Sequence, residues 1–235
     1  MYWSSGVEGS VWDAERALER PGARRLTNAT PNKVIGRFPS VKMGRVVWWE
    51  SQIERDYIYL LEIDPDVLAY KEQPFRVKLE LFGSLRSYVP DFLVVRKSRK
   101  QIVEVKPVEK VTTEENSLLF PVMRQIAAER RYEYMVVTDR MIRVQPRLNN
   151  IKLLFRYART EIQPQHQVGI IKFVQEHPRA RIGEISEFLK GEAISLRVLY
   201  SLLFWNVLKI DLDQPIDATS HISLDVKGQT AGEAR

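Results

Sequence analysis

Two carboxylates and a lysine occupy neighbouring extended segments of the chain. Asp91 follows Pro90 near the start of one segment, and Glu104-Val105-Lys106 lies on the next. Side chains at positions i and i+2 of a strand share a face, so Glu104 and Lys106 point the same way. Carboxylates placed beside an ammonium group suit a divalent cation and a phosphate substrate.

The turn between the two segments is centred near Ser98, so antiparallel pairing places Glu104 opposite about residue 92. Asp91 then lies one step away, and a bend at Pro90 can bring its carboxylate to the Glu104 face. Two nearby carboxylates repel each other, and a hard cation such as Mg²⁺ removes that penalty. The sequence therefore predicts a Mg²⁺ site here, in which Mn²⁺ can substitute.

Two further groups complete the predicted site. Lys106 can orient or deprotonate an attacking water, or stabilise charge on the phosphate. Glu54 lies on a predicted helix from Trp49 to Ile63 and could supply a third carboxylate, with Glu50 as the competing choice. Each motif taken singly is more often structural, as a solvated strand face or a turn, and only their combination favours catalysis.

The elements that must position these groups form a mixed α/β pattern. The expected elements are a short helix near 11–20, a helix over 49–63, extended segments over 67–81 and 85–95, a strand over 101–105, a helix of about 114–131, a strand over 134–137 and a helix over 147–159. A capping box is expected at Thr112 before the helix at 114, and a kink or interruption at Pro121. From residue 49 on, the order helix, three strands, helix, strand, helix predicts a compact α/β domain with a mixed sheet.

The sequence predicts these domains: a basic N-terminal arm (1–46), the domain that holds the carboxylates (47–162), a winged-helix domain (163–226) and a disordered tail (227–235). Apolar residues recur at helical spacing over 168–174, 182–189 and 196–208, before a hairpin.

Composition excludes several kinds of site. The chain has 235 residues, no cysteine and three histidines, so disulfide scaffolds, thiolate zinc sites and cysteine nucleophiles are ruled out. No apolar run approaches the ~18 residues of a transmembrane helix, and no signal peptide is evident. A cytoplasmic protein with no membrane partner is the expectation.

The net charge of +6 is unevenly distributed. Residues 20–49 carry seven basic and no acidic residues, whereas residues 166–235 have a net charge of −1. The basic segment predicts contacts with nucleic-acid phosphates, which would be sensitive to salt. Its expected members are Arg37, Lys42 and Arg45, and Gln73 near the carboxylates is a further candidate for contacting DNA. The helix at about 195–208 has Arg197 as its one charge, which favours protein docking over phosphate binding.

The same residues carry a family resemblance. Pro90-Asp91 followed by Glu104-Val105-Lys106 resembles the PD-(D/E)xK nuclease signature. The longer strings Glu50–Pro65, Glu72–Pro74, Tyr88–Val94 and Val103–Pro107 resemble TnsA-type transposon endonucleases. The resemblance is strong over about 34–110 and implies a restriction-endonuclease-like fold, with a looser likeness to the winged helix of that family.

The resemblance implies specific roles. Glu54, Asp91 and Glu104, with the backbone carbonyl of Val105, would bind the metal, and Lys106 would be the active-site lysine. The protein would be a Mg²⁺-dependent endonuclease that cuts the 5′ strands at transposon ends. Its expected partners are DNA, a TnsB-type DDE transposase and a TnsC-type AAA+ regulator that docks on the C-terminal domain, all in a prokaryotic cytoplasm.

Two alternatives stay open at the level of sequence. One is a restriction-like or junction-resolving nuclease that acts alone. The other is a non-catalytic DNA-binding adaptor whose carboxylates are structural.

Overall fold

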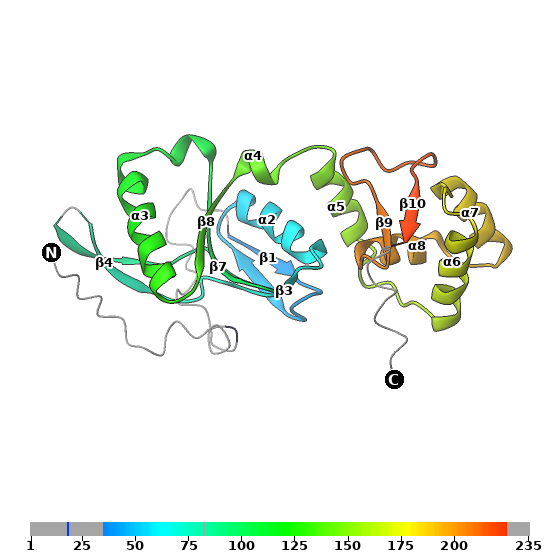
Figure 1. Cartoon of the computed structure of the whole chain (residues 1–235), viewed down its shortest axis with the longest axis horizontal. Coiled ribbons are helices and arrows are strands. Elements are labelled where there is room, and N and C mark those ends of the chain that lie inside the picture. Colours follow the sequence, from blue (N-terminus) through cyan, green and yellow to red (C-terminus); the bar gives the residue numbers. More distant parts are fainter. Residues whose placement is uncertain (1–17, 19–34, 82, 225–235) are drawn as a thin grey trace. The chain divides into compact units, whose positions relative to one another are not determined.

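The chain divides into two compact units, residues 1–143 and 144–235. The computed structural model describes residues 18, 35–81 and 83–224 (Figure 1). The expected helix near 11–20, apart from Leu18, and the expected tail 227–235 lie outside the described residues.

The first unit is a mixed α/β domain, as the sequence predicts. Among the described residues, its central sheet has four strands in the order β3-β6-β7-β8, in which β7 and β8 are parallel and the other pairs are antiparallel. Its elements are β1 (Gly36–Pro39), β2 (Val46–Trp49), α2 (Gln52–Ile63), β3 (Val67–Glu72), β4 (Val77–Leu81), β5 (Ser84–Tyr88), β6 (Phe92–Arg96), β7 (Lys100–Lys106), a 3-10 turn (Val108–Lys110), α3 (Glu114–Glu129), β8 (Glu133–Thr138) and α4 (Asp139–Ile142).

The two faces of the sheet are covered by different helices. Leu93 and Ile102 pack in one apolar cluster with Leu119 and Met123 of α3. Phe92 points to the other face, where its ring lies 5.5 Å from the ring of Tyr57 on α2. Successive strand residues alternate between faces, so the β6–β7 pair is buried on both sides and its end near Asp91 is held in place by the core.

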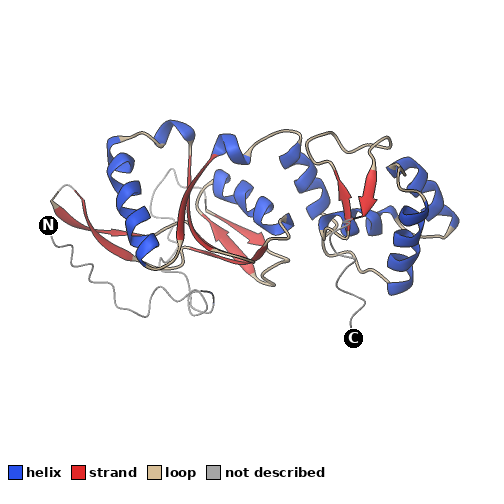
Figure 2. Cartoon of the chain, viewed as in Figure 1, coloured by secondary structure: helices blue, strands red, loops and turns tan. Residues whose placement is uncertain are grey.

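Three local expectations for this unit were wrong. The extended stretches 67–81 and 85–95 each break into two strands, and β4 and β5 form a separate antiparallel ribbon that extends from the sheet beside α3 (Figure 2). Residues 36–49 form the β1–β2 hairpin rather than part of an arm. The helix α3 runs unbroken through Pro121 and has Thr113 as its N-cap, without a side-chain capping bond.

The hairpin is ordered by close packing and by a buried carboxylate. A Cβ atom on Gly36 would overlap the Trp49 ring, so only glycine fits there. Glu62, which is 1% exposed, accepts hydrogen bonds from Ser40 Oγ and from the backbone N–H groups of Val41 and Lys42. These contacts join the hairpin to α2, which is why the segment is not a free arm.

The described part of the second unit, residues 144–224, contains four helices followed by a two-stranded antiparallel sheet. Its elements are α5 (Arg147–Phe155), α6 (Pro164–Glu176), α7 (Ile182–Gly191), α8 (Leu196–Phe204), β9 (Leu208–Ile210) and β10 (Ile222–Leu224). The last three helices and the hairpin follow the order expected from the sequence.

The boundary between the units lies between Arg143 and Val144, not after residue 162. The helix α5 belongs to the second unit because the Phe155 ring packs 5.8 Å from that of Phe204, and the Asn150 amide donates to the carbonyls of Leu212 and Gln214. The amphipathic pattern of α5 shows that one face is buried but does not say against which domain.

Candidate active site

Strand register brings Asp91 and Glu104 together. Phe92 pairs with Val103, so one further step along the ladder sets Asp91 opposite Glu104, one residue from the expected register. The reason is the turn: Arg96 N–H donates to the Arg99 carbonyl at 2.8 Å, which centres the turn between residues 97 and 98.

Asp91 is tied to both neighbouring strands. Its Oδ2 accepts the backbone N–H of Val105 at 2.7 Å, and its own carbonyl accepts the backbone N–H of Gln73 at 2.8 Å. Gln73 has φ of 43°, a left-handed conformation that is uncommon outside glycine. Gln73 therefore lies beside the site, as expected, and its contact with Asp91 is made by its backbone N–H.

Glu104 is almost completely buried, with 1% of its surface exposed. Its Oε1 contacts the Lys106 ammonium, and its Oε2 accepts the hydroxyl of Tyr88. The Tyr134 hydroxyl lies 3.4 Å from that of Tyr88. Glu104 and Lys106 thus share a face of β7, as the i, i+2 spacing predicts.

The charged side chains at this end of the sheet shift one another's pKa values. Burial, and then the carboxylates of Glu104 and Glu54, raise the pKa of Asp91 well above its ordinary value. Burial alone would lower the pKa of Lys106, but the carboxylates of Glu104, Asp91 and Glu54 together raise it. The site therefore holds more negative charge than its one lysine balances.

Glu54 lies in the first turn of α2 and acts on this cluster through its charge. Its backbone N–H donates to the N-cap Ser51 Oγ at 3.1 Å, and its Oε2 accepts the backbone N–H of Glu50 at 2.8 Å. Its charge acts on both Asp91 and Lys106.

The donor set fits a hard divalent cation. Asp91 and Glu104 offer oxygen ligands. Burial, and then repulsion by the Glu104 and Glu54 carboxylates, raises the pKa of Asp91, and a bound cation would relieve that repulsion. Within residues 35–81 and 83–224, no three His, Cys, Asp or Glu side chains lie close enough to enclose a metal. Mg²⁺ is commonly held by one or two carboxylates, with waters and substrate phosphate as its other ligands.

The three basic residues expected to bind DNA differ in environment. Arg37 is exposed and lies over the Trp48 ring, 4.7 Å from its centroid. Lys42 Nζ donates to the carbonyls of Asp64 and Val67, at 2.5 and 2.8 Å. Arg45 forms two bonds to Glu72, at 2.8 and 2.6 Å. Lys42 and Arg45 are thus engaged in hydrogen bonds within the domain, whereas Arg37 is exposed to solvent.

Sequence reasoning did not single out Tyr88 or Tyr134. Tyr88 stands two residues before Pro90, on the β4–β5 ribbon, whereas Tyr134 comes from β8. β5 shows no alternation that would single out Tyr88, because its first four residues are all exposed and only Tyr88 is half-buried. For Tyr134 no local signal exists, because the parallel pairing of β7 with β8 brings it to the site.

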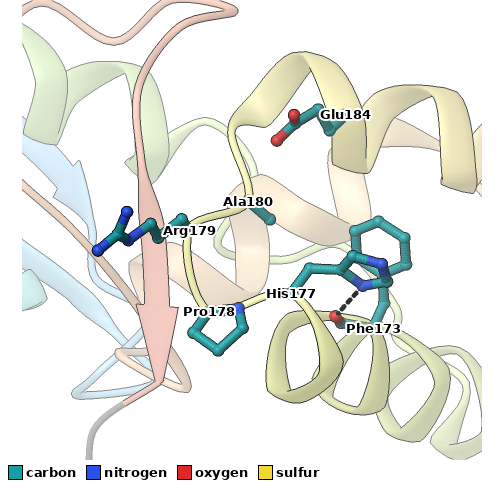
Figure 3. A pocket seen from close by; sticks show the side chains of 6 residues that line it. All are labelled: Phe173, His177, Pro178, Arg179, Ala180 and Glu184. Carbon is teal, nitrogen blue, oxygen red and sulfur yellow. Dashed lines mark hydrogen bonds between the residues drawn. The ribbon is translucent and has the colours of Figure 1, made fainter.

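The second unit has a separate pocket of about 550 Å³ between α6 and α7 (Figure 3). Its walls include Phe173, which stacks on His177 with ring centroids 4.4 Å apart and on Phe188 at 4.5 Å. The pocket contains none of the carboxylates described above. It is a concave, aromatic feature of a unit whose net charge is close to zero.

The fold and the clustered acidic and lysine side chains fit the restriction-endonuclease-like class of nuclease domains. Residues 64–139 match the family model described as TnsA-like endonuclease N terminal. This match supports a TnsA-type endonuclease domain in the first unit. The matched range includes Asp91, Glu104 and Lys106 but begins after Glu54. No curated protein matches the chain.

No helix in the described part of the chain is long and apolar enough to cross a membrane.

Proposed function

We propose that this protein is the metal-dependent endonuclease subunit of a heteromeric Tn7-type transposase and cuts the 5′ strands at the transposon ends. The observation that carries the proposal is the meeting of Asp91, Glu104 and Lys106 at one end of the β6–β7 pair, inside the segment that matches the TnsA-like family. The DNA substrate follows from that match, whereas the cleaved strand is inferred from the resemblance.

In this proposal Asp91 and Glu104 would hold a Mg²⁺ ion, with the Val105 carbonyl as a further ligand. Glu54 does not form a three-carboxylate group with them in the described structure, so we propose that it contributes through its negative charge. The bound ion would acidify a water and polarise the phosphodiester. Water oxygen attacks phosphorus and the bond to the 3′ oxygen breaks, which leaves a 5′-phosphate and a 3′-hydroxyl. The ammonium of Lys106, which contacts Glu104, would stabilise charge that develops on the phosphate oxygens.

The second unit would serve as the partner-docking domain. We interpret its three helices and hairpin as a winged helix, and propose that it binds a TnsC-type AAA+ regulator. The helix α8 takes the position of the recognition helix in a winged helix, but it buries Val198, Leu199 and Leu202. This burial does not favour contacts between α8 and DNA bases. A TnsB-type DDE transposase would cut the 3′ strands.

Strand-specific cleavage tests the proposal. DNA that carries the element's own end is incubated with Mg²⁺ or Mn²⁺, with and without the neighbouring transposase, and the two strands carry different labels. A 5′-strand nick that requires the metal, the partner and Asp91 is expected. Cleavage of the 3′ strand alone, unchanged by Asp91→Asn, would show that this chain is an adaptor.

A matched control separates charge loss at the site from charge loss in general. Asp66 lies near the other end of β6, where its carboxylate contacts Arg96 at 3.3 Å. Asp66→Asn should cut DNA at the wild-type rate. Partner-independent cutting of generic DNA by the wild type would instead favour the stand-alone nuclease.

A further inference from the structure

We propose that Tyr88 is a positioning residue for Glu104, and that its hydroxyl sets the affinity of the site for a divalent cation. The inference rests on the proposed function, because it assigns Glu104 to cation binding. It adds a residue from the β4–β5 ribbon to the site.

The contact is direct and enclosed. The Tyr88 hydroxyl donates to Oε2 of Glu104, whereas the Lys106 ammonium occupies Oε1. Glu104 is 1% exposed, so water has little access to either oxygen. The two donors hold the carboxylate at both ends and thereby fix the plane in which its remaining lone pairs can bind a cation.

A phenol is protonated at neutral pH, so Tyr88 can donate its hydroxyl proton to the Glu104 carboxylate. Tyr134 supports it from β8, since the two hydroxyl oxygens lie 3.4 Å apart. Glu104 is therefore oriented from two strands that are not its own, β5 directly and β8 through Tyr88.

The fold places Tyr88 where it can couple two parts of the domain. Tyr88 is the last residue of β5 and pairs with Val77 of β4, so its ring belongs to the ribbon while its hydroxyl reaches β7. Partners that orient a metal ligand contribute about 10–100-fold to metal affinity or activity. We expect a loss of that size when the hydroxyl is removed.

The chain offers a closely matched control. Tyr70 donates its hydroxyl to Oε1 of Glu62 at 2.6 Å, and Glu62 is also 1% exposed. Tyr70→Phe and Tyr88→Phe therefore remove the same hydroxyl from a tyrosine that donates to a buried glutamate, although Tyr70 is fully buried and Tyr88 only partly. Glu62 holds the hairpin turn at residues 40–42 and has no contact with Glu104 among the interactions of the described residues.

The experiment titrates Mn²⁺ into the full chain by calorimetry, without DNA or partner proteins. Tyr88→Phe should weaken Mn²⁺ binding about 10–100-fold, and Tyr70→Phe should leave it unchanged at a similar cost in melting temperature. Equal affinity of wild type and Tyr88→Phe overturns the inference and leaves the nuclease proposal standing. Absence of Mn²⁺ binding by the wild type overturns both.

A double variant tests whether Tyr88 acts through Glu104. In that case Tyr88→Phe/Glu104→Gln should bind Mn²⁺ no more weakly than Glu104→Gln alone. Losses that add in the double variant would show that Tyr88 does not act through Glu104 and would overturn the inference.

Discussion

The carboxylate of Asp91 accepts the backbone N–H of Val105 at 2.7 Å. Backbone pairing between β6 and β7 ends at Phe92 and Val103. Beyond that pair, the Asp91 side chain provides the acceptor for the Val105 N–H that a backbone carbonyl would provide within the ladder. The same side chain that is proposed to bind the cation therefore also satisfies a buried donor. Substitutions at Asp91 can separate the two roles.

Asp91→Asn should abolish cleavage and raise stability in the presence of EDTA. The amide keeps an oxygen acceptor for the Val105 N–H but cannot ionise. Burial, and then Glu104 and Glu54, raise the pKa of the Asp91 carboxyl, so its charged form is unfavourable in the folded protein without a cation. Asp91→Ala should abolish cleavage and cost about 1–3 kcal/mol, because the Val105 N–H loses its partner. Thermal melting in EDTA measures both, and an amide variant less stable than wild type would contradict the argument.

Divalent cations should stabilise the wild-type protein. A cation that binds the folded state at a concentration 100 times its Kd contributes about 2.7 kcal/mol, or about 5–10 °C in melting temperature. Mn²⁺ and Mg²⁺ should produce this shift in the wild type and much less of it in Asp91→Asn. An equal shift in both variants would place the bound cation elsewhere.

Arg37 and Arg45 should respond differently to substitution. Arg37→Ala should weaken DNA binding with little effect on folding, and should lower the salt dependence of log K by about 0.9 for one lost phosphate contact. Arg45→Ala breaks the paired bonds to Glu72 and should cost about 1–2 kcal/mol of stability. Binding isotherms at several salt concentrations, together with melting curves, compare the two variants. A steeper loss of binding in Arg45→Ala than in Arg37→Ala would reverse the assignment.

Lys42 should make stability depend on alkaline pH. Burial lowers its pKa from 10.5 to about 8, against the opposing pull of Asp64 and Glu62. Between pH 8 and 10.5 the unfolded chain binds more protons at this lysine than the folded one, so its contribution to stability rises with pH. Relative to Lys42→Met, wild-type stability should increase across this window, by at most about 1–2 kcal/mol for a half-buried group. Denaturant unfolding at about pH 7.5 and about pH 10 tests the sign, and a decrease would contradict it.

The unit boundary predicts which C-terminal fragment folds. Residues 144–224 retain α5, whose Arg147 forms two bonds of 2.6 Å to Asp213 and whose Phe155 packs on Phe204. A fragment that begins at residue 163 lacks these contacts and exposes the apolar side of α8. The longer fragment should show cooperative melting and the shorter one should not. Cooperative melting of the shorter fragment would restore the boundary expected from sequence.

Much of the nuclease unit follows from local pattern. The helix over residues 52–63, the strand before Pro107 and the shared face of Glu104 and Lys106 depend on periodicity and on i, i+2 geometry, which are properties of neighbouring residues. Proximity of Asp91 to Glu104 also follows, since a short turn between two strands fixes their register to within a residue. The resemblance to TnsA-type endonucleases is confirmed over residues 64–139.

Other features required the tertiary structure. The one-residue register correction depends on the hydrogen bond that closes the turn at Arg96, and the place of Tyr134 depends on parallel pairing between strands separated by α3. The sequence identifies Lys42 and Arg45 as basic but cannot show their hydrogen bonds. Lys42 donates to the carbonyls of Asp64 and Val67, and Arg45 donates to the carboxylate of Glu72. A count of charged residues gives the number of charged side chains, whereas long-range packing decides which of those side chains still face solvent.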